Sequence, residues 1–515
     1  MILKKLNENY YIYVILFFVL FPVNFLPQLF DGVSIDYAYE IGDFDAIELW
    51  YKERSRHFSL IIFYFINFVT KYTSLPVEFF FDNFSIIFLI LFCIEVKKYS
   101  LLFFGLEKKW ANLAALFTAI FPVWHILVSF DIGLYLISFF FVLCGYRNFI
   151  KLNKLNKTIG LFFIIFSFYI ESNLSFVIGL SFVHLLLNYS RKRIDFSYRG
   201  FFAIIIISFA YYFLKSSYLP TQGDYSNYNI LTLKSIISAI TNPRFIQNII
   251  NYSTYLLLFL WIPIIYFLHI ILLNRDYFLK NKTNIKTFFG LNYNNNYFLL
   301  FVLSFFAALP YLIINSIIPS ILYLSDYYQR HVLLLAPISA IFFSSMFKDM
   351  FKFNFLPKKI NFNFYLFCFI FINLILLNYG NLRKTEAYLF KKNLITELKS
   401  HGSIPRGNVE IIGKNFPAEL RNTEISHLFY KAYDEAGWWG TLKWIPHDEE
   451  NKFLNPSLEF LDKKYLTIKI LNDYINECNT SIYIKNDLKK IERIKKFYIF
   501  HYKENYNLDK IVKRC

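Results

Sequence analysis

Cysteine is scarce in this sequence, with five residues among 515. No CxxC pair and no cluster of His and Cys is present, so the sequence predicts no structural zinc site. Cys93, Cys144 and Cys368 lie in apolar runs, where cysteine behaves as a small core residue. Cys478 and Cys515 lie in the polar C-terminal stretch, and they are the one pair there that could form a disulfide in an oxidising compartment.

Nucleotide-binding motifs are also missing. Without a Walker A loop the chain is not expected to be a P-loop ATPase, and without a GxGxxG motif between a strand and a helix a nucleotide-sugar Rossmann domain is not expected. The net charge of +17 would suit a nucleic-acid partner. Most basic residues of the apolar part, however, stand in short loops between apolar runs, which is typical of a membrane topology signal. We therefore expect no nucleic-acid partner.

Long apolar runs are the main feature of the chain. Hydrophobic residues make up 56% of the sequence, and its mean hydropathy is +0.38. Since about 20 apolar residues cross the hydrocarbon core, the runs predict an all-α polytopic membrane protein with about 11–13 transmembrane helices. A Lys pair, Lys4 and Lys5, precedes the first run, and no small-residue cleavage site follows it. This predicts a retained first helix rather than a cleaved signal peptide.

Basic loops set the predicted orientation. The four loops at residues 146–157, 190–199, 274–290 and 347–359 are rich in Lys and Arg and are expected to be cytoplasmic. The acidic loop 31–57 and the loops at 171–173, 217–251 and 324–330 then face outward, in a plasma (inner) membrane. Three apolar runs lie between residues 58 and 130, where this scheme needs an even number of crossings. One of these three runs is therefore expected to be re-entrant or only half-spanning.

Two domains are predicted. Residues 1–380 form the transmembrane domain, with the outward loop 31–57. Residues 381–515 alternate short β-like stretches, such as "NVEIIG" and "SIYIKN", with helical ones. They predict a small α+β domain on the extracytoplasmic side.

The densest acidic patch of the chain lies in the first outward loop. Its seven acids are Asp31, Asp36, Glu40, Asp43, Asp45, Glu48 and Glu53. Most are expected to be solvated, and Glu48 and Glu53 are expected to pair with Lys52, Arg54 and Arg56 in a surface helix. Asp31 and Asp36 lie at the apolar boundary, where partial desolvation raises the basicity of a carboxylate. Either one could accept a proton from an incoming nucleophile.

This loop opens with an Asp, continues with a Tyr and a "GD", and ends in "RSRH". It resembles the glycosyltransferases of the GT-C fold, in particular the protein O-mannosyltransferase and lipid A aminoarabinose transferase group. In that class the first outward loop holds the catalytic acid. The stretch 111–141 is also similar to the group, with small residues, Pro122 and then Asp131 opening a helix. Asp131 is read equally well as a helix N-cap. The chain departs from the pattern with "DG" in place of "DE" and "RHFSL" in place of "HPP".

A late outward loop carries the pair Arg330 and His331, where an apolar run begins. Such a pair is often a membrane-boundary anchor. The resemblance implies instead that basic residues here hold the phosphate of the donor, a task that the planar guanidinium of arginine suits. Arg244, in the outward loop 217–251, is a further candidate for this role. The residues expected to line the substrates are Tyr37, Arg56, His57, Glu171, Tyr327 and Tyr328.

The leading hypothesis is thus a membrane glycosyltransferase. It would move a sugar from a polyprenyl-phosphate carrier to an extracytoplasmic glycan, lipid or protein. Asp31 or Asp36 would be the base and Asp131 would bind or orient the acceptor. The sequence specifies no cofactor and leaves a requirement for a divalent cation open. An O-antigen polymerase or ligase, which relies on outward Arg and His, is the alternative. A transporter or flippase is a third class, disfavoured because the sequence has no related halves.

Overall fold

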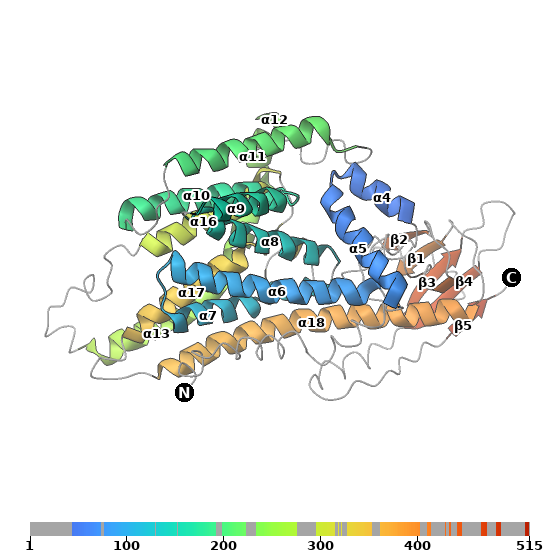
Figure 1. Ribbon diagram of the computed structural model, residues 1–515. Coiled ribbons are helices and arrows are strands. Elements are labelled where there is room, and N and C mark those ends of the chain that lie inside the picture. Colours follow the sequence, from blue (N-terminus) through green and yellow to red (C-terminus); the bar gives the residue numbers. More distant parts are fainter. Residues whose placement is uncertain are drawn as a thin grey trace.

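The computed structural model describes residues 44–401 with gaps, and five strands beyond them (Figure 1). Beyond residue 401 the described residues are the strands, Leu428, Ala432 and Tyr433. The gaps before it are residues 74–76, 129, 152, 192–197, 223–232, 276–294, 315–317, 319–320, 322–326 and 353–360. The described part is mostly helical, which confirms the predicted helical class.

Helices follow one another along the described part of the chain up to residue 401. The first half contains α4 (Phe44–Glu53), α5 (His57–Thr73), α6 (Val77–Leu102), α7 (Lys108–Ala119), the 3-10 helix η2 (Pro122–Val128), α8 (Phe130–Phe149), α9 (Lys154–Ser167) and α10 (Ser172–Arg191). The second half contains α11 (Tyr198–Tyr218), α12 (Leu233–Thr241), α13 (Pro243–Leu273), α16 (Asn295–Ile313), the 3-10 helix η4 (Tyr327–Val332), α17 (Leu335–Lys352) and α18 (Phe362–His401).

Four of the described helices are long and apolar enough to cross a membrane. They are α11, α13, α16 and the first half of α18. Large apolar side chains point outward from them: Phe213 of α11 is 70% exposed and Phe301 of α16 is 71% exposed. Exposed apolar faces on long helices are expected where the surroundings are lipid tails rather than water. These helices therefore indicate a membrane protein.

Helix α7 and η2 together run alongside α18. The ring of Phe117 in α7 lies 4.5 Å from that of Phe369, and further along, a Cβ on Gly380 would lie 2.5 Å from the ring of His125 in η2. Twelve α-helical and seven 3-10 residues span about 30 Å at their usual rises per residue. The pair α7–η2 therefore covers a length similar to that of a membrane helix, although α7 alone is too short.

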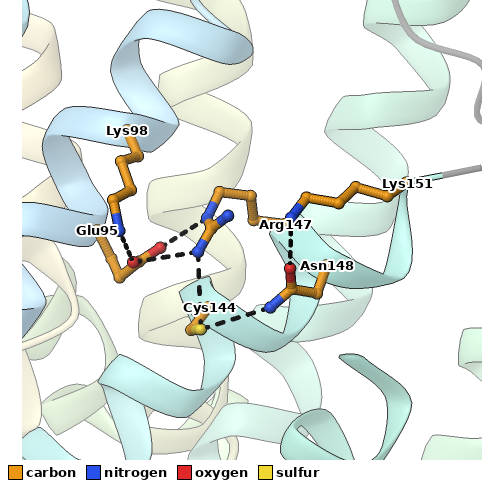
Figure 2. Close-up of polar contacts among 6 residues, drawn as sticks. All are labelled: Glu95, Lys98, Cys144, Arg147, Asn148 and Lys151. Atoms are coloured by element: carbon orange, nitrogen blue, oxygen red, sulfur yellow. Dashed lines mark hydrogen bonds and ion pairs between the residues drawn. The ribbon is translucent and has the colours of Figure 1, made fainter. Parts of the chain in front are cut away.

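Helices α6 and α8 run side by side in the same direction. The rings of Phe88 and Phe140 lie 5.9 Å apart. Further along both helices is an ion pair, with Arg147 Nε 2.8 Å from Glu95 Oε2 (Figure 2). Helix α8 ends two residues after this ion pair, and α6 ends two turns after it. We call this end of the bundle, with the α6–α7 and α8–α9 connections, the basic end. The opposite end, which carries η2 and η4, is called the η end.

Helix α5 has both of its ends at the η end. Near its start, Phe58 lies 4.7 Å from Tyr169, whose hydroxyl donates to the carbonyl oxygen of Leu134 near the start of α8. Midway along it, Phe65 lies 6.3 Å from Phe84 in the third turn of α6, and Figure 1 shows α5 lying across the end of the bundle where α6 begins. Of the three apolar runs between residues 58 and 130, this run is therefore the one that does not pass along the bundle.

The described strands form one five-stranded sheet of order β2-β1-β3-β4-β5. They are β1 (Val409–Gly413), β2 (Gly440–Trp444), β3 (Tyr465–Ile470), β4 (Thr480–Lys485) and β5 (Lys510–Lys513). Strand β1 pairs with β2 in parallel, and the other neighbours are antiparallel. In Figure 1 the sheet lies at the C-terminal end of α18. Since α18 is continuous from 362 to 401, the predicted boundary at residue 380 falls inside a helix. Cys478 and Cys515 lie outside the described residues.

Candidate active site

The η end gathers segments that are far apart in the sequence. Besides η2, η4 and the start of α5, it holds the α9–α10 turn, because the hydroxyl of Tyr169 in this turn donates to the carbonyl oxygen of Leu134 near the start of α8. It also holds the start of α13, because the backbone N–H of Ile318, ahead of η4, donates to Asn248 Oδ1 at 3.0 Å. Every outward segment predicted from the described part of the sequence thus lies at one end.

The 3-10 helix η4 presents Arg330 and His331. His331 is buried, and its ring stacks on Tyr311 of α16 with centroids 4.4 Å apart and planes 23° apart. Arg330 is half-buried beside it. A guanidinium held in partly dry surroundings binds phosphate oxygens more strongly than one in water. Tyr327 and Tyr328 belong to the same 3-10 helix, and their side chains lie outside the described residues.

The 3-10 helix η2 packs against η4 and brings a residue that the sequence reasoning missed, His125. This histidine is buried, and its Nδ1 lies 2.9 Å from the carbonyl oxygen of Pro122. A carbonyl can only accept a hydrogen bond, so Nδ1 carries the proton and the neutral ring has Nε2 as its acceptor atom. Gly380 of α18 makes room for this ring, because a Cβ there would lie 2.5 Å from it.

The only signal for His125 in the sequence was its position between Pro122 and Asp131. A lone histidine in an apolar run is usually a core residue, so its role depends on which elements pack around it. The packing of η2 between α18 and η4 supplies that information.

Glu171 lies in the α9–α10 turn and forms an ion pair with Lys215, in the last turn of α11. Lys215 is 10% exposed and Glu171 is 30% exposed, so the pair is partly dry. Beside it, burial raises the pKa of the Tyr169 hydroxyl well above its usual value, and the positive charge of Arg56 acts in the opposite direction. Arg56 and Glu171, both predicted to line the substrates, are therefore brought to the same turn.

The acidic loop reaches the η end through α4. Its last residues are fixed to the segment after α11. Ser55 Oγ donates to the carbonyl oxygen of Leu219, and the backbone N–H of Gln222 donates to the carbonyl oxygen of Glu53 at 2.8 Å. Residues 53–55, at the C-terminal side of the loop, are thus fixed at the η end. His57, the first residue of α5, is half-buried next to this junction.

Within α4, Glu48 forms an ion pair with Lys52 one turn later and accepts a hydrogen bond from Tyr64. Both contacts lower the pKa of this exposed carboxyl, the one with Lys52 more. The prediction that Glu48 pairs with Lys52 in a surface helix is therefore confirmed.

The remaining predicted residues divide into two sets. Asp131 lies in the first turn of α8, with its backbone at the η end, and Arg244 is exposed in the first turn of α13. The side chain of Asp131, like all of Asp31, Asp36 and Tyr37, lies outside the described residues. Within the described residues, no group of three or more His, Cys, Asp and Glu side chains is arranged to hold a metal ion.

Comparisons with protein-family models, with curated proteins and with solved structures found no match for this chain.

Proposed function

We propose that this protein is a polytopic membrane glycosyltransferase that moves a sugar from a polyprenyl-phosphate carrier to an extracytoplasmic glycan, lipid or protein. The observation that carries the proposal is the gathering of residues at the η end. Arg330 and His331 of η4, His125 of η2 and the start of α8 with Asp131 meet there, at the end to which α4 anchors the acidic loop.

The proposed orientation places the basic end in the cytoplasm and the η end outside. In this scheme α6 and the pair α7–η2 cross the membrane, while α5 lies at the outer surface. Two crossings between residues 58 and 130 then bring Asp131 back to the outer face, as the sequence requires. The long α18 would leave the membrane on the outer side and carry residues 381–515 as an extracytoplasmic α+β domain.

In the proposed reaction, a hydroxyl or amine of the acceptor attacks the anomeric carbon of the donor sugar. Asp31 or Asp36 takes the proton of the acceptor, and Asp131 orients it. The bond between the anomeric carbon and the phosphate oxygen breaks, and polyprenyl phosphate leaves. Arg330 and His331 stabilise the charge on the phosphate, which is where preorganised donors lower the barrier most.

His125 is given a positioning role in this scheme. With its Nδ1 proton directed to Pro122, its Nε2 can accept a proton or a hydrogen bond from His331, Arg330 or the substrate. The ring would thus fix the geometry of η4 against η2.

The alternative is an O-antigen polymerase or ligase, in which outward Arg and His rather than an acid carry the reaction. The buried His331 beside Arg330 suits that alternative as well. Replacing Asp31 and Asp36 by Asn separates the two functions, because only a glycosyltransferase that uses a carboxylate as its base loses activity. Replacing Arg330 impairs both functions.

A further inference from the structure

The connections at the basic end carry far more positive than negative charge. Residues 95–109 and 144–157 contain seven lysines and one arginine but only two acids, Glu95 and Glu107. The ion pair between Glu95 and Arg147 joins α6 to α8, so both stretches belong to one surface. The surface is cationic whichever way the chain is oriented in a membrane.

Both acids of this surface are already engaged. Glu95 is buried and binds Arg147 through two nitrogens, at 2.8 and 3.2 Å, and Lys98 at 2.7 Å (Figure 2). Glu107 lies 3.4 Å from Lys109. With eight basic residues and two acids, the two stretches keep a net charge of +6, which a bound anion would lower.

Exposed apolar side chains lie directly beside the exposed lysines. Leu102 closes α6 with 58% of its surface exposed. In α9, Leu155 is 65% exposed between the exposed Lys154 and Lys157, and Phe162 two turns further is 62% exposed. Positions 155 and 162 share a helix face. Amines next to an apolar face match a molecule with an anionic head and a hydrocarbon chain.

We propose that the basic end is a binding surface for anionic phospholipids, with Lys108, Lys154 and Lys157 at the headgroup and Phe162 along the acyl chains. A free phosphate or a nucleic acid would gain nothing from the exposed apolar face. The inference is independent of the proposed glycosyl transfer, because it involves the opposite end of the bundle.

The test uses the full chain, purified in mixed micelles of phosphatidylcholine and phosphatidylglycerol. The lipid that copurifies is quantified by mass spectrometry, and the melting temperature is measured with each lipid. The variant is Lys108→Gln/Lys154→Gln/Lys157→Gln. Its matched control, Lys52→Gln/Lys71→Gln/Lys234→Gln, removes three lysines from other surfaces. A third variant replaces the first three lysines by Arg and keeps the charge.

We expect wild type, the control and the Arg variant to enrich phosphatidylglycerol over phosphatidylcholine and to melt at a higher temperature with it. The enrichment of phosphatidylglycerol should be at least tenfold lower in the Gln variant. Raised salt should weaken this enrichment in wild type. Equal retention of both lipids by wild type, or unchanged enrichment in the Gln variant, would overturn the proposal. So would equal stabilisation by soluble glycerol phosphate, which would identify a free-phosphate site. Should the Gln variant not fold, the salt titration of wild type decides: enrichment that is insensitive to salt contradicts the proposal.

Discussion

His125 and His331 lie on two different 3-10 helices that pack against each other, and each ring is fixed by a different neighbour. His331 stacks on Tyr311, whereas His125 fits against Gly380 and bonds to the carbonyl of Pro122. Rings held in this way cannot adjust to a larger neighbour without moving the 3-10 helix. At the scale of single residues, we therefore expect substitutions in η2 and η4, or beside their rings, to change activity strongly.

Replacing Arg330 by Gln should lower the rate of sugar transfer by about 10²–10³, because a fixed donor to the leaving phosphate is lost. Lys at this position should restore only part of the rate, since it lacks the planar fork. Arg275→Gln, at an exposed position two residues after α13, is the control for the lost charge. Release of polyprenyl phosphate from lipid-linked sugars is the measurement. A full rate for Arg330→Gln would remove this residue from the donor site.

Gly380→Ala should lower transfer about as much as His125→Gln, because the new Cβ displaces the ring of His125. The double variant should be no slower than either single one, since both changes remove the same arrangement. Transfer rates and melting temperatures of all three variants are compared. Additive losses of rate, with unchanged melting temperatures, would show that the two positions act separately.

At the scale of helices, the sequence predicted the class and the grouping of the basic loops but not the course of each apolar run. Mean apolarity does not distinguish α5, which stays at the η end, from a run that passes along the bundle. That distinction depends on contacts such as Phe58 with Tyr169 and Phe65 with Phe84. The pairing of Glu48 with Lys52 was predictable because it is local, one helical turn apart. His125 was not, because its neighbours come from α18 and η4.

The α8–α9 hairpin depends on close backbone contact at Gly160. A Cβ there would lie 2.3 Å from the backbone nitrogen of Phe149 and 2.6 Å from the carbonyl oxygen of Gly145. Backbone atoms cannot move aside cheaply, so Gly160→Ala should destabilise the protein by about 1–3 kcal/mol or more. Thr158→Ala, on the exposed part of the same helix, should cost little. Thermal unfolding in detergent measures both, and equal melting temperatures would contradict this packing.

At the scale of the whole molecule, the two ends of the bundle must face different compartments. The test uses intact cells that make the protein with its five native cysteines replaced. In this background, Leu420→Cys should react with an impermeant thiol reagent from outside. Leu155→Cys, in the first turn of α9, should react only after the membrane is opened. The proposed orientation places residue 420 outside the cell and residue 155 in the cytoplasm. Labelling of residue 155 and not of residue 420 in intact cells would invert the whole orientation.

The site itself was predictable only in part. All the site residues that were predicted from the sequence and that the structure describes lie at the η end. Among them are Arg56, His57, Glu171, Arg244 and His331. They come from loops of the same predicted side, so orientation alone was enough to group them. Which of them face one another depends on helix packing, and no pattern along the chain encodes it. The role of the acidic loop is therefore a matter for direct measurement.

The most direct measurement is the release of polyprenyl phosphate from the lipid-linked sugar fraction of the host membrane by the purified full chain and its acidic-loop variants. Wild type should release it in the presence of acceptor. Asp31→Asn or Asp36→Asn should slow release by about 10²–10⁴, because the proton acceptor is lost, while the protein is made and inserted normally. Glu48→Gln should be nearly as active as wild type, since Glu48 is an exposed carboxylate paired with Lys52. Full activity of both Asn variants would contradict the account and favour the Arg- and His-based polymerase or ligase in its place.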